Sequence, residues 1–169
     1  MANGKFTNED AKNAGKTADA VNKVALAAQS AQNAISDANA EMGELAEKSK
    51  KAGVGIDGMF KNAKRDVDSL AGSIGRLASF NKQDLKDRKK RNQISKDLAN
   101  VVSKRAKVNS QIASNSERIK TATGQEKADL IAANKILFNS RDTADGILED
   151  FEGINDQIDK VKPLPKTNV

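Results

Sequence analysis

The sequence contains no cysteine and no histidine among its 169 residues. Without cysteine the chain can form neither disulfides nor thiolate metal sites, and without histidine it lacks the commonest general base and metal ligand. Any catalysis would have to use carboxylates, lysines or hydroxyls. No serine or lysine stands in a known nucleophile motif, so we expect a protein that is not an enzyme and that binds no cofactor or metal.

Large side chains are also scarce, because the chain has only 5 Phe and neither Trp nor Tyr. A compact core depends on large side chains, so this composition argues against a globular ball. The sequence has no run of about 18 apolar residues, and we expect no stable membrane span. Its most apolar segment, LIAANKILF at 130–138, is short and contains Lys135. The start, MANGKFTNED, has no apolar region typical of a secretory signal.

What the sequence does have is a long apolar repeat. Between Ala14 and Ala63, positions spaced alternately by three and four residues are nearly all apolar, and this spacing is typical of coiled coils. Because such a seam is a narrow stripe, another helix has to cover it. We predict an all-α fold whose long helices form an extended, parallel, homo-oligomeric coiled coil, with a trimer preferred to a hexamer.

Two further series with the same spacing follow in 94–122 and 125–161. Arg105 and Asn115 are polar members of the second series. They either fix register and strand number inside a core or face solvent. The residues predicted to form the oligomer seam are Val21, Val24, Ala28, Ala31, Ile35, Ala38, Met42, Leu45, Ile56, Met59, Ile94, Leu98, Val101, Val108, Ile112, Ile119, Ile147, Phe151, Ile154 and Ile158.

Glycines and charge divide this elongated region, and we expect breaks near Gly53–Gly58, Ser79–Asn92 and Gly124. At Gly124 the chain either turns back into an antiparallel hairpin or continues as a rod with a local defect. The predicted organisation within 1–169 is an Ala-rich heptad helix at 7–80, a basic connector at 81–93, heptad helices at 94–122 and 125–161, and an extended tail at 162–169 that begins at two prolines.

Three local patterns have a chemical interpretation as well as a structural one. GVGIDG at 53–58 matches the dinucleotide fingerprint, but no strand precedes it and a hinge is the better interpretation. Asp145 and Glu149 have the spacing of a helical metal site, although ordinary surface charge explains them better. The third pattern is a basic cluster that consists of Lys86, Arg88, Lys89, Lys90 and Arg91. It either contacts phosphate or an acidic partner, or lies in a solvated helical turn or loop.

The Ala- and Ser-rich heptads, the glycine-interrupted segment AGVGIDGMFKNAKRDVDSLAGSIGRLASF and the mixed-charge segment DLKDRKKRNQISKDLANVVSKRAKVNSQI resemble the tail tape measure proteins of tailed bacteriophages, particularly contractile ones. The resemblance is spread over most of the chain. It implies a helical filament in several copies inside the tail tube that sets tube length and leaves ahead of the DNA. A fully helical chain would reach about 250 Å, whereas tape measures are usually far longer.

The same resemblance implies the partners and the location. The partners would be further copies of the chain, the tail tube, baseplate or tail-tip proteins and, transiently, DNA, and the location would be the virion tail after assembly in the host cytoplasm. Two other classes are a secreted helical effector or pore-forming translocator component, and a nucleic-acid-associated structural coiled coil. The basic cluster favours the latter, while the net charge of +6 is modest because acidic residues are interspersed.

Overall fold

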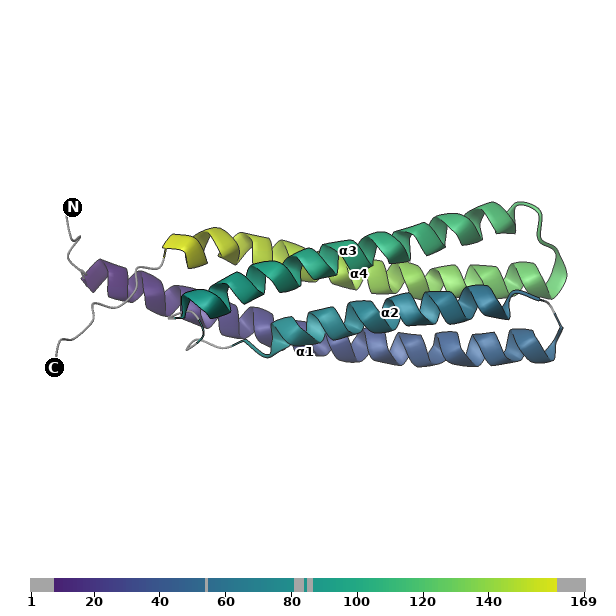
Figure 1. The fold of residues 1–169 in the computed structure, drawn as a ribbon, viewed down its shortest axis with the longest axis horizontal. Helices are drawn as coiled ribbons and strands as arrows, with labels where there is room; N and C mark the ends of the chain where they lie inside the picture. Colours follow the sequence, from purple (N-terminus) through teal and green to yellow (C-terminus); the bar gives the residue numbers. More distant parts are fainter. Residues whose placement is uncertain (1–7, 54, 81–83, 85–86, 161–169) are drawn as a thin grey trace.

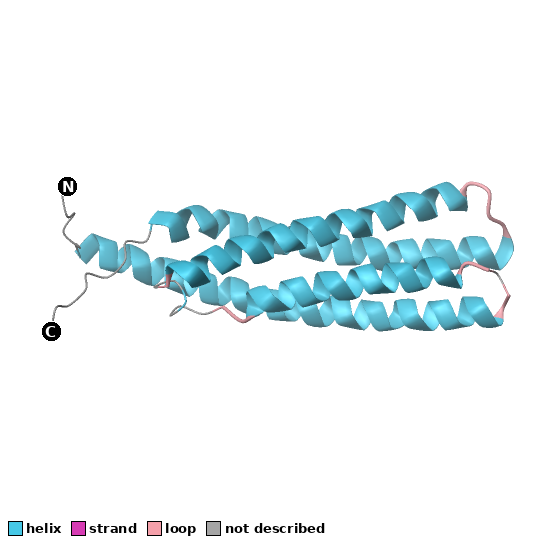
Figure 2. Cartoon of the chain, viewed as in Figure 1, coloured by secondary structure: helices cyan, strands magenta, loops and turns pink. Residues whose placement is uncertain are grey.

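The protein is seen in a computed structural model that describes residues 8–53, 55–80, 84 and 87–160. These residues form four helices, α1 (Asn8–Lys51), α2 (Asp57–Ala78), α3 (Arg88–Ile119) and α4 (Gly124–Lys160). Figure 2 shows helices joined by loops and no strand in this part of the chain. The all-α prediction is confirmed. None of the described helices has an apolar stretch long enough to cross a membrane.

The helices run alternately up and down along one common axis (Figure 1). Gly43 of α1 lies against Lys64 of α2, and Gln32 lies against Gly75, so residue numbers fall along α1 as they rise along α2. Each helix packs on its neighbours in sequence, and α4 also packs on α1. The described residues therefore form an antiparallel four-helix bundle within one chain.

The expected extended arrangement is wrong for this part of the chain, because the helices reverse direction at every link, whereas parallel pairing between copies stays a prediction. A heptad pattern specifies a face that must be covered, but neither which helix covers it nor in which direction. The links coincide with the breaks expected near Gly53–Gly58, Ser79–Asn92 and Gly124. Gly124 has φ +57, a left-handed conformation that glycine adopts readily, and it lies at a turn rather than at a defect in a rod.

The predicted segment boundaries change accordingly. The segment 7–80, expected as one helix, contains both α1 and α2. Helix α3 begins at Arg88, so much of the expected connector 81–93 is helical. The expected tail at 162–169 lies outside the described residues.

Local side chains explain three of the helix ends. Lysines occupy the last turn of α1, where the helix dipole favours cations. The Asp87 carboxylate accepts a hydrogen bond of 2.7 Å from the backbone N–H of Lys89 and caps α3. At the end of α2, the Ser79 hydroxyl donates to the Arg76 carbonyl over 2.6 Å. The start of α2 differs, since its N-cap Ile56 supplies no side-chain hydrogen bond.

The predicted seam residues form much of the core of this bundle. Those buried are Ala28, Ala31, Ile35, Met42, Ile56, Ile94, Val101, Val108, Ile112, Ile147 and Phe151, and those partly buried against them are Val24, Ala38, Leu45, Met59, Leu98 and Ile119. The side chains of Val21, Ile154 and Ile158 lie outside the described set. The expectation that other chains must cover the seam is wrong for the buried positions, whereas an oligomer stays a prediction.

The buried face of each helix is wider than a coiled-coil seam. Asn39 is more deeply buried than the predicted Ala38, and Asp97 is more deeply buried than Leu98. A helix in a four-helix bundle contacts two neighbours at once, so it buries positions on both sides of the three-four stripe. The sequence pattern alone could not show which of two adjacent residues is the more deeply buried, because steps of three and of four residues both keep to one face of a helix.

Phe60 tests the packing of this core, since its side chain is fully buried in α2. We expect Phe60→Ala to lower the free energy of unfolding by about 3–5 kcal/mol, through lost apolar burial and a residual cavity. Urea unfolding followed by circular dichroism measures this change. Val102→Ala is the control, because Val102 is 52% exposed on α3, and its effect should stay within about 0.5 kcal/mol. Similar effects of the two substitutions would contradict the described packing.

Candidate functional site

Asp97 is the most deeply buried carboxylate among the described residues. It lies on α3 and accepts hydrogen bonds of 3.2 Å from Arg76 Nε of α2 and of 3.2 Å from Gln93 Nε2. Arg76 also donates to the Ser73 hydroxyl through Nη2 over 3.0 Å. The hydrogen-bonded ion pair between Asp97 and Arg76 therefore joins α3 to α2.

Similar polar contacts join the other helix pairs. The Gln111 amide of α3 donates to Asp66 of α2 over 3.1 Å, and the Asn134 amide of α4 donates to the Ser116 hydroxyl of α3 over 3.1 Å. These residues were missed in the sequence, where the only available signal was their position beside the seam. These hydrogen bonds fix which helices pair and how the paired helices are aligned along the bundle axis.

The two polar seam residues have different surroundings. Arg105 is half-buried and forms an ion pair with Asp145 of α4, with Nη2 donating to Oδ2 over 3.1 Å. Asn115 is buried, and its Nδ2 finds no protein partner among the described residues. Asn115 therefore lies inside the core, while Arg105 lies at its edge and connects α3 to α4.

The alternative metal site at Asp145 and Glu149 is not assembled in the structure. Asp145 is engaged by Arg105, and Glu149 is exposed. Among the described residues, no group of three or more acidic side chains is placed to hold a metal ion. Glu149 is better explained as a surface carboxylate, and Asp145 as one partner of an ion pair between α3 and α4.

The glycines of the GVGIDG segment serve a turn. Gly53 and Gly55 have φ +69 and +79, and helix α1 precedes them. A dinucleotide fingerprint requires a strand before the glycines, and the described part of the chain before this segment is helical. The hinge interpretation of the glycines is retained.

The basic cluster lies mainly in the first turn of α3. Arg88, Lys89 and Lys90 are exposed there, and Arg91 is half-buried; Lys86 lies outside the described residues. The positive end of the helix dipole disfavours cations at this position, and the first turn holds no acidic residue. The cluster thus places exposed side-chain cations around the start of α3, where the Asp87 carboxylate already accepts from the Lys89 N–H.

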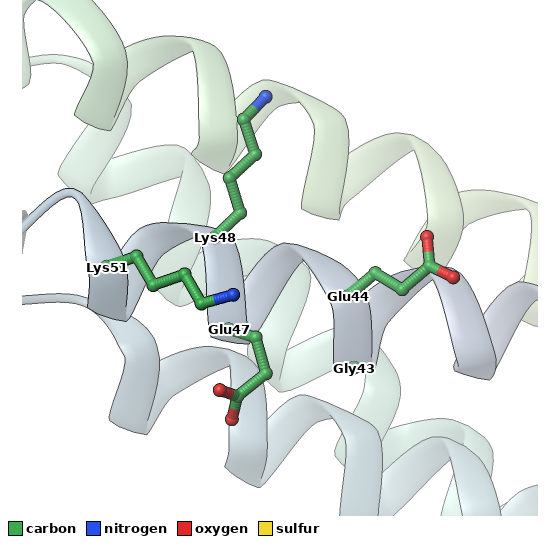
Figure 3. A pocket seen from close by; sticks show the side chains of 5 residues that line it. All are labelled: Gly43, Glu44, Glu47, Lys48 and Lys51. Atoms are coloured by element: carbon green, nitrogen blue, oxygen red, sulfur yellow. The ribbon is translucent and has the colours of Figure 1, made fainter.

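Two open hollows mark the surface of the bundle. One is lined by Gly43, Glu44, Glu47, Lys48 and Lys51 of α1, with Glu47 and Lys48 directed to opposite sides of the helix (Figure 3). Its glutamates precede lysines by four residues, a spacing that stabilises a solvated helix face. The other lies where α2 ends against α1 and is lined by Asn22, Ala25, Leu26, Gln29, Ala78 and Phe80. Leu26 is 71% exposed there.

The placement of the basic cluster predicts an unusual effect on stability. We expect the double substitution Lys89→Glu and Lys90→Glu to raise the free energy of unfolding by about 0.3–1 kcal/mol, because it replaces cations with anions at the start of α3. Lys96→Glu is the control, since Lys96 is also exposed on α3 but lies beyond its first turn. Urea unfolding at low salt measures both changes. A loss of stability in the double variant would contradict the dipole argument.

The described polar residues thus mostly join helices, and the basic start of α3 remains as a surface with a distinct charge. Comparison of the chain with protein-family models, with curated proteins and with solved structures finds no match in any of the three. The functional interpretation therefore rests on the chain's own residues.

Proposed function

We propose that this chain is a structural component of a bacteriophage tail, of the tape measure kind, which acts through helix packing and leaves the tail when DNA is ejected. The observation that carries the proposal is the uniform construction of the chain. All four helices present apolar residues at the same three-four spacing, with Ala, Ser and Asn among the buried positions. This composition agrees with the resemblance of the sequence to tape measure proteins.

The size of the bundle bears on how such a component would act. Helix α1 has 44 residues and so spans about 66 Å, whereas a fully extended helical chain would span about 250 Å. A folded-back chain would therefore contribute about a quarter of its contour length to a filament. We propose that several copies of the chain assemble along the tail tube, with tube and baseplate or tail-tip proteins as further partners.

The small side chains on the buried face of α1 support the release step of this proposal. Ala25, Ala28, Ala31 and Ala46 make up most of the buried apolar positions of α1. Burial of alanine contributes far less apolar area than burial of leucine or phenylalanine. An element that must unfold or slide to leave a narrow tube gains from such weak packing.

The proposal is tested by following the chain in purified tails of the phage that carries it. We expect the chain in intact tails, in a fixed ratio to the tube protein, and we expect it to be missing from tails that have ejected their DNA. Quantitative mass spectrometry of the two preparations measures the ratio, and the tube protein is the internal control. Absence from intact tails, or equal amounts before and after ejection, would overturn the proposal.

A second candidate function is contact with DNA through the basic start of α3. Exposed cations at the positive end of a helix dipole favour phosphate. We expect Lys89→Glu with Lys90→Glu to weaken binding to duplex DNA at least about 10-fold and to reduce the salt dependence of binding, because fewer counterions are released. Lys96→Glu should have a smaller effect. Equal losses for the variant and the control would indicate non-specific charge attraction instead of a site.

A further inference from the structure

We propose that the link between α1 and α2 is a hinge through which two copies of this chain exchange α1 and form a two-fold symmetric dimer. In the exchanged form, α1 and α2 join into one helix, and α1 of each copy packs on α2 and α4 of the other. The surface that receives it is the face that α1 covers in the closed bundle. The inference goes beyond the proposed tail function and is tested independently of it.

The apolar spacing runs through the link without interruption. Ser49, Ala52, Ile56 and Met59 follow one another by three, four and three residues, which is the alternation found within each helix. A continuous helix would therefore keep the apolar face of α1 in line with that of α2. A link that served only as a turn would not need this register.

The start of α2 is poorly satisfied in the closed bundle. The first N–H groups of a helix have no partner within the helix and are usually capped by a side chain. Ile56, the N-cap of α2, provides no such bond. In a continuous helix, carbonyl groups of the link, four residues earlier in the chain, would accept hydrogen bonds from these N–H groups.

The link between α3 and α4 shows what a fixed turn looks like in the same protein. Arg118 Nε donates to Glu126 Oε1 across that turn over 2.6 Å, the Thr121 hydroxyl donates to the Arg118 carbonyl, and Ala122 is buried. In the described part of the α1–α2 link, Ala52, Gly53 and Gly55 are exposed and only Ile56, next to α2, is buried. A side chain added at either glycine would meet no atom within 4 Å.

Helix α1 is held by packing on α2 and α4, with few polar contacts. Among its described side chains, only Asn39 forms a hydrogen bond to another helix, with Asp68 of α2. By contrast, α3 and α4 are joined by Arg105 with Asp145, Asn134 with Ser116, and Arg141 with Asn109. Opening therefore breaks mainly non-directional packing, which the same face of a second copy can replace.

Exchange restores every contact that opening removes. The same residues of α1 meet the same residues of α2 and α4, but from a second copy. The closed monomer and the dimer therefore share one interface and differ in structure mainly at the hinge, and the protein concentration decides which form is populated. Repeated exchange from copy to copy, without closure, would build a longer assembly from the same contacts.

The hinge is tested by Gly53→Ala with Gly55→Ala. Alanine is strained at the positive φ of the closed turn and favoured in the continuous helix, so the association constant should rise on the order of 100-fold or more. Analytical ultracentrifugation over a concentration series measures it, and circular dichroism checks that helix content is kept. A dimer or larger helical oligomer supports the hinge, and a helical monomer at all concentrations overturns it.

The matched control is Gly58→Ala with Gly72→Ala. Both glycines lie within α2, have open space around an added methyl group and lack a positive φ. These substitutions raise helix propensity by the same amount without straining the turn. The control should remain as monomeric as the wild type, and dimerisation of this control to the same extent would overturn the hinge assignment.

A cross-link keeps the proposal falsifiable if the hinge variant does not fold. Because the chain has no cysteine, Asn39→Cys with Asp68→Cys introduces one pair at contacting positions of α1 and α2. Oxidation should trap monomers at low concentration and covalent dimers in a growing fraction at high concentration, as seen on a non-reducing gel. Cross-linked monomers alone at every concentration would overturn the exchange.

Discussion

A narrow apolar stripe on each helix is the constraint on which the rest of this structure depends. A helix that carries such a stripe is stable in water only when another helix covers it. Here four stripes cover one another around a common axis, with Phe60, Phe151, Ile35 and Met42 fully buried between them. The loops, the polar contacts and the order of the helices are all arranged to bring these stripes together.

Polar contacts then decide which of the many possible helix arrangements is formed. The carboxylate of Asp97 is matched by Arg76, Asp66 by Gln111 and Asp145 by Arg105. A shift of one helix by one turn would leave these groups without partners, and a buried polar group without a partner is destabilising. These polar contacts lie among α2, α3 and α4, whereas α1 is held mainly by its extensive packing on α2 and α4.

The sequence predicted the helices, the breaks between them and many of the buried positions, because each depends on local spacing. Ile35, Met42 and Val101 were identified from the three-four alternation alone. The reversals at the first two links were not predicted, and the reversal at Gly124 was one of two alternatives, since an apolar face is equally well covered by a parallel or an antiparallel neighbour. Asn39 and Asp97 were missed because their burial depends on a second neighbouring helix, which no pattern within a single helix specifies.

The position of the two ends of the bundle has a mechanical consequence. Helix α1 begins and α4 ends at the same end of the bundle (Figure 1), and the two helices pack on each other. A load applied between these ends would separate α1 from α4 by peeling, turn after turn, instead of shearing the whole interface at once. Resistance to such a pull would be set by the few contacts at the advancing edge and not by the total strength of the fold.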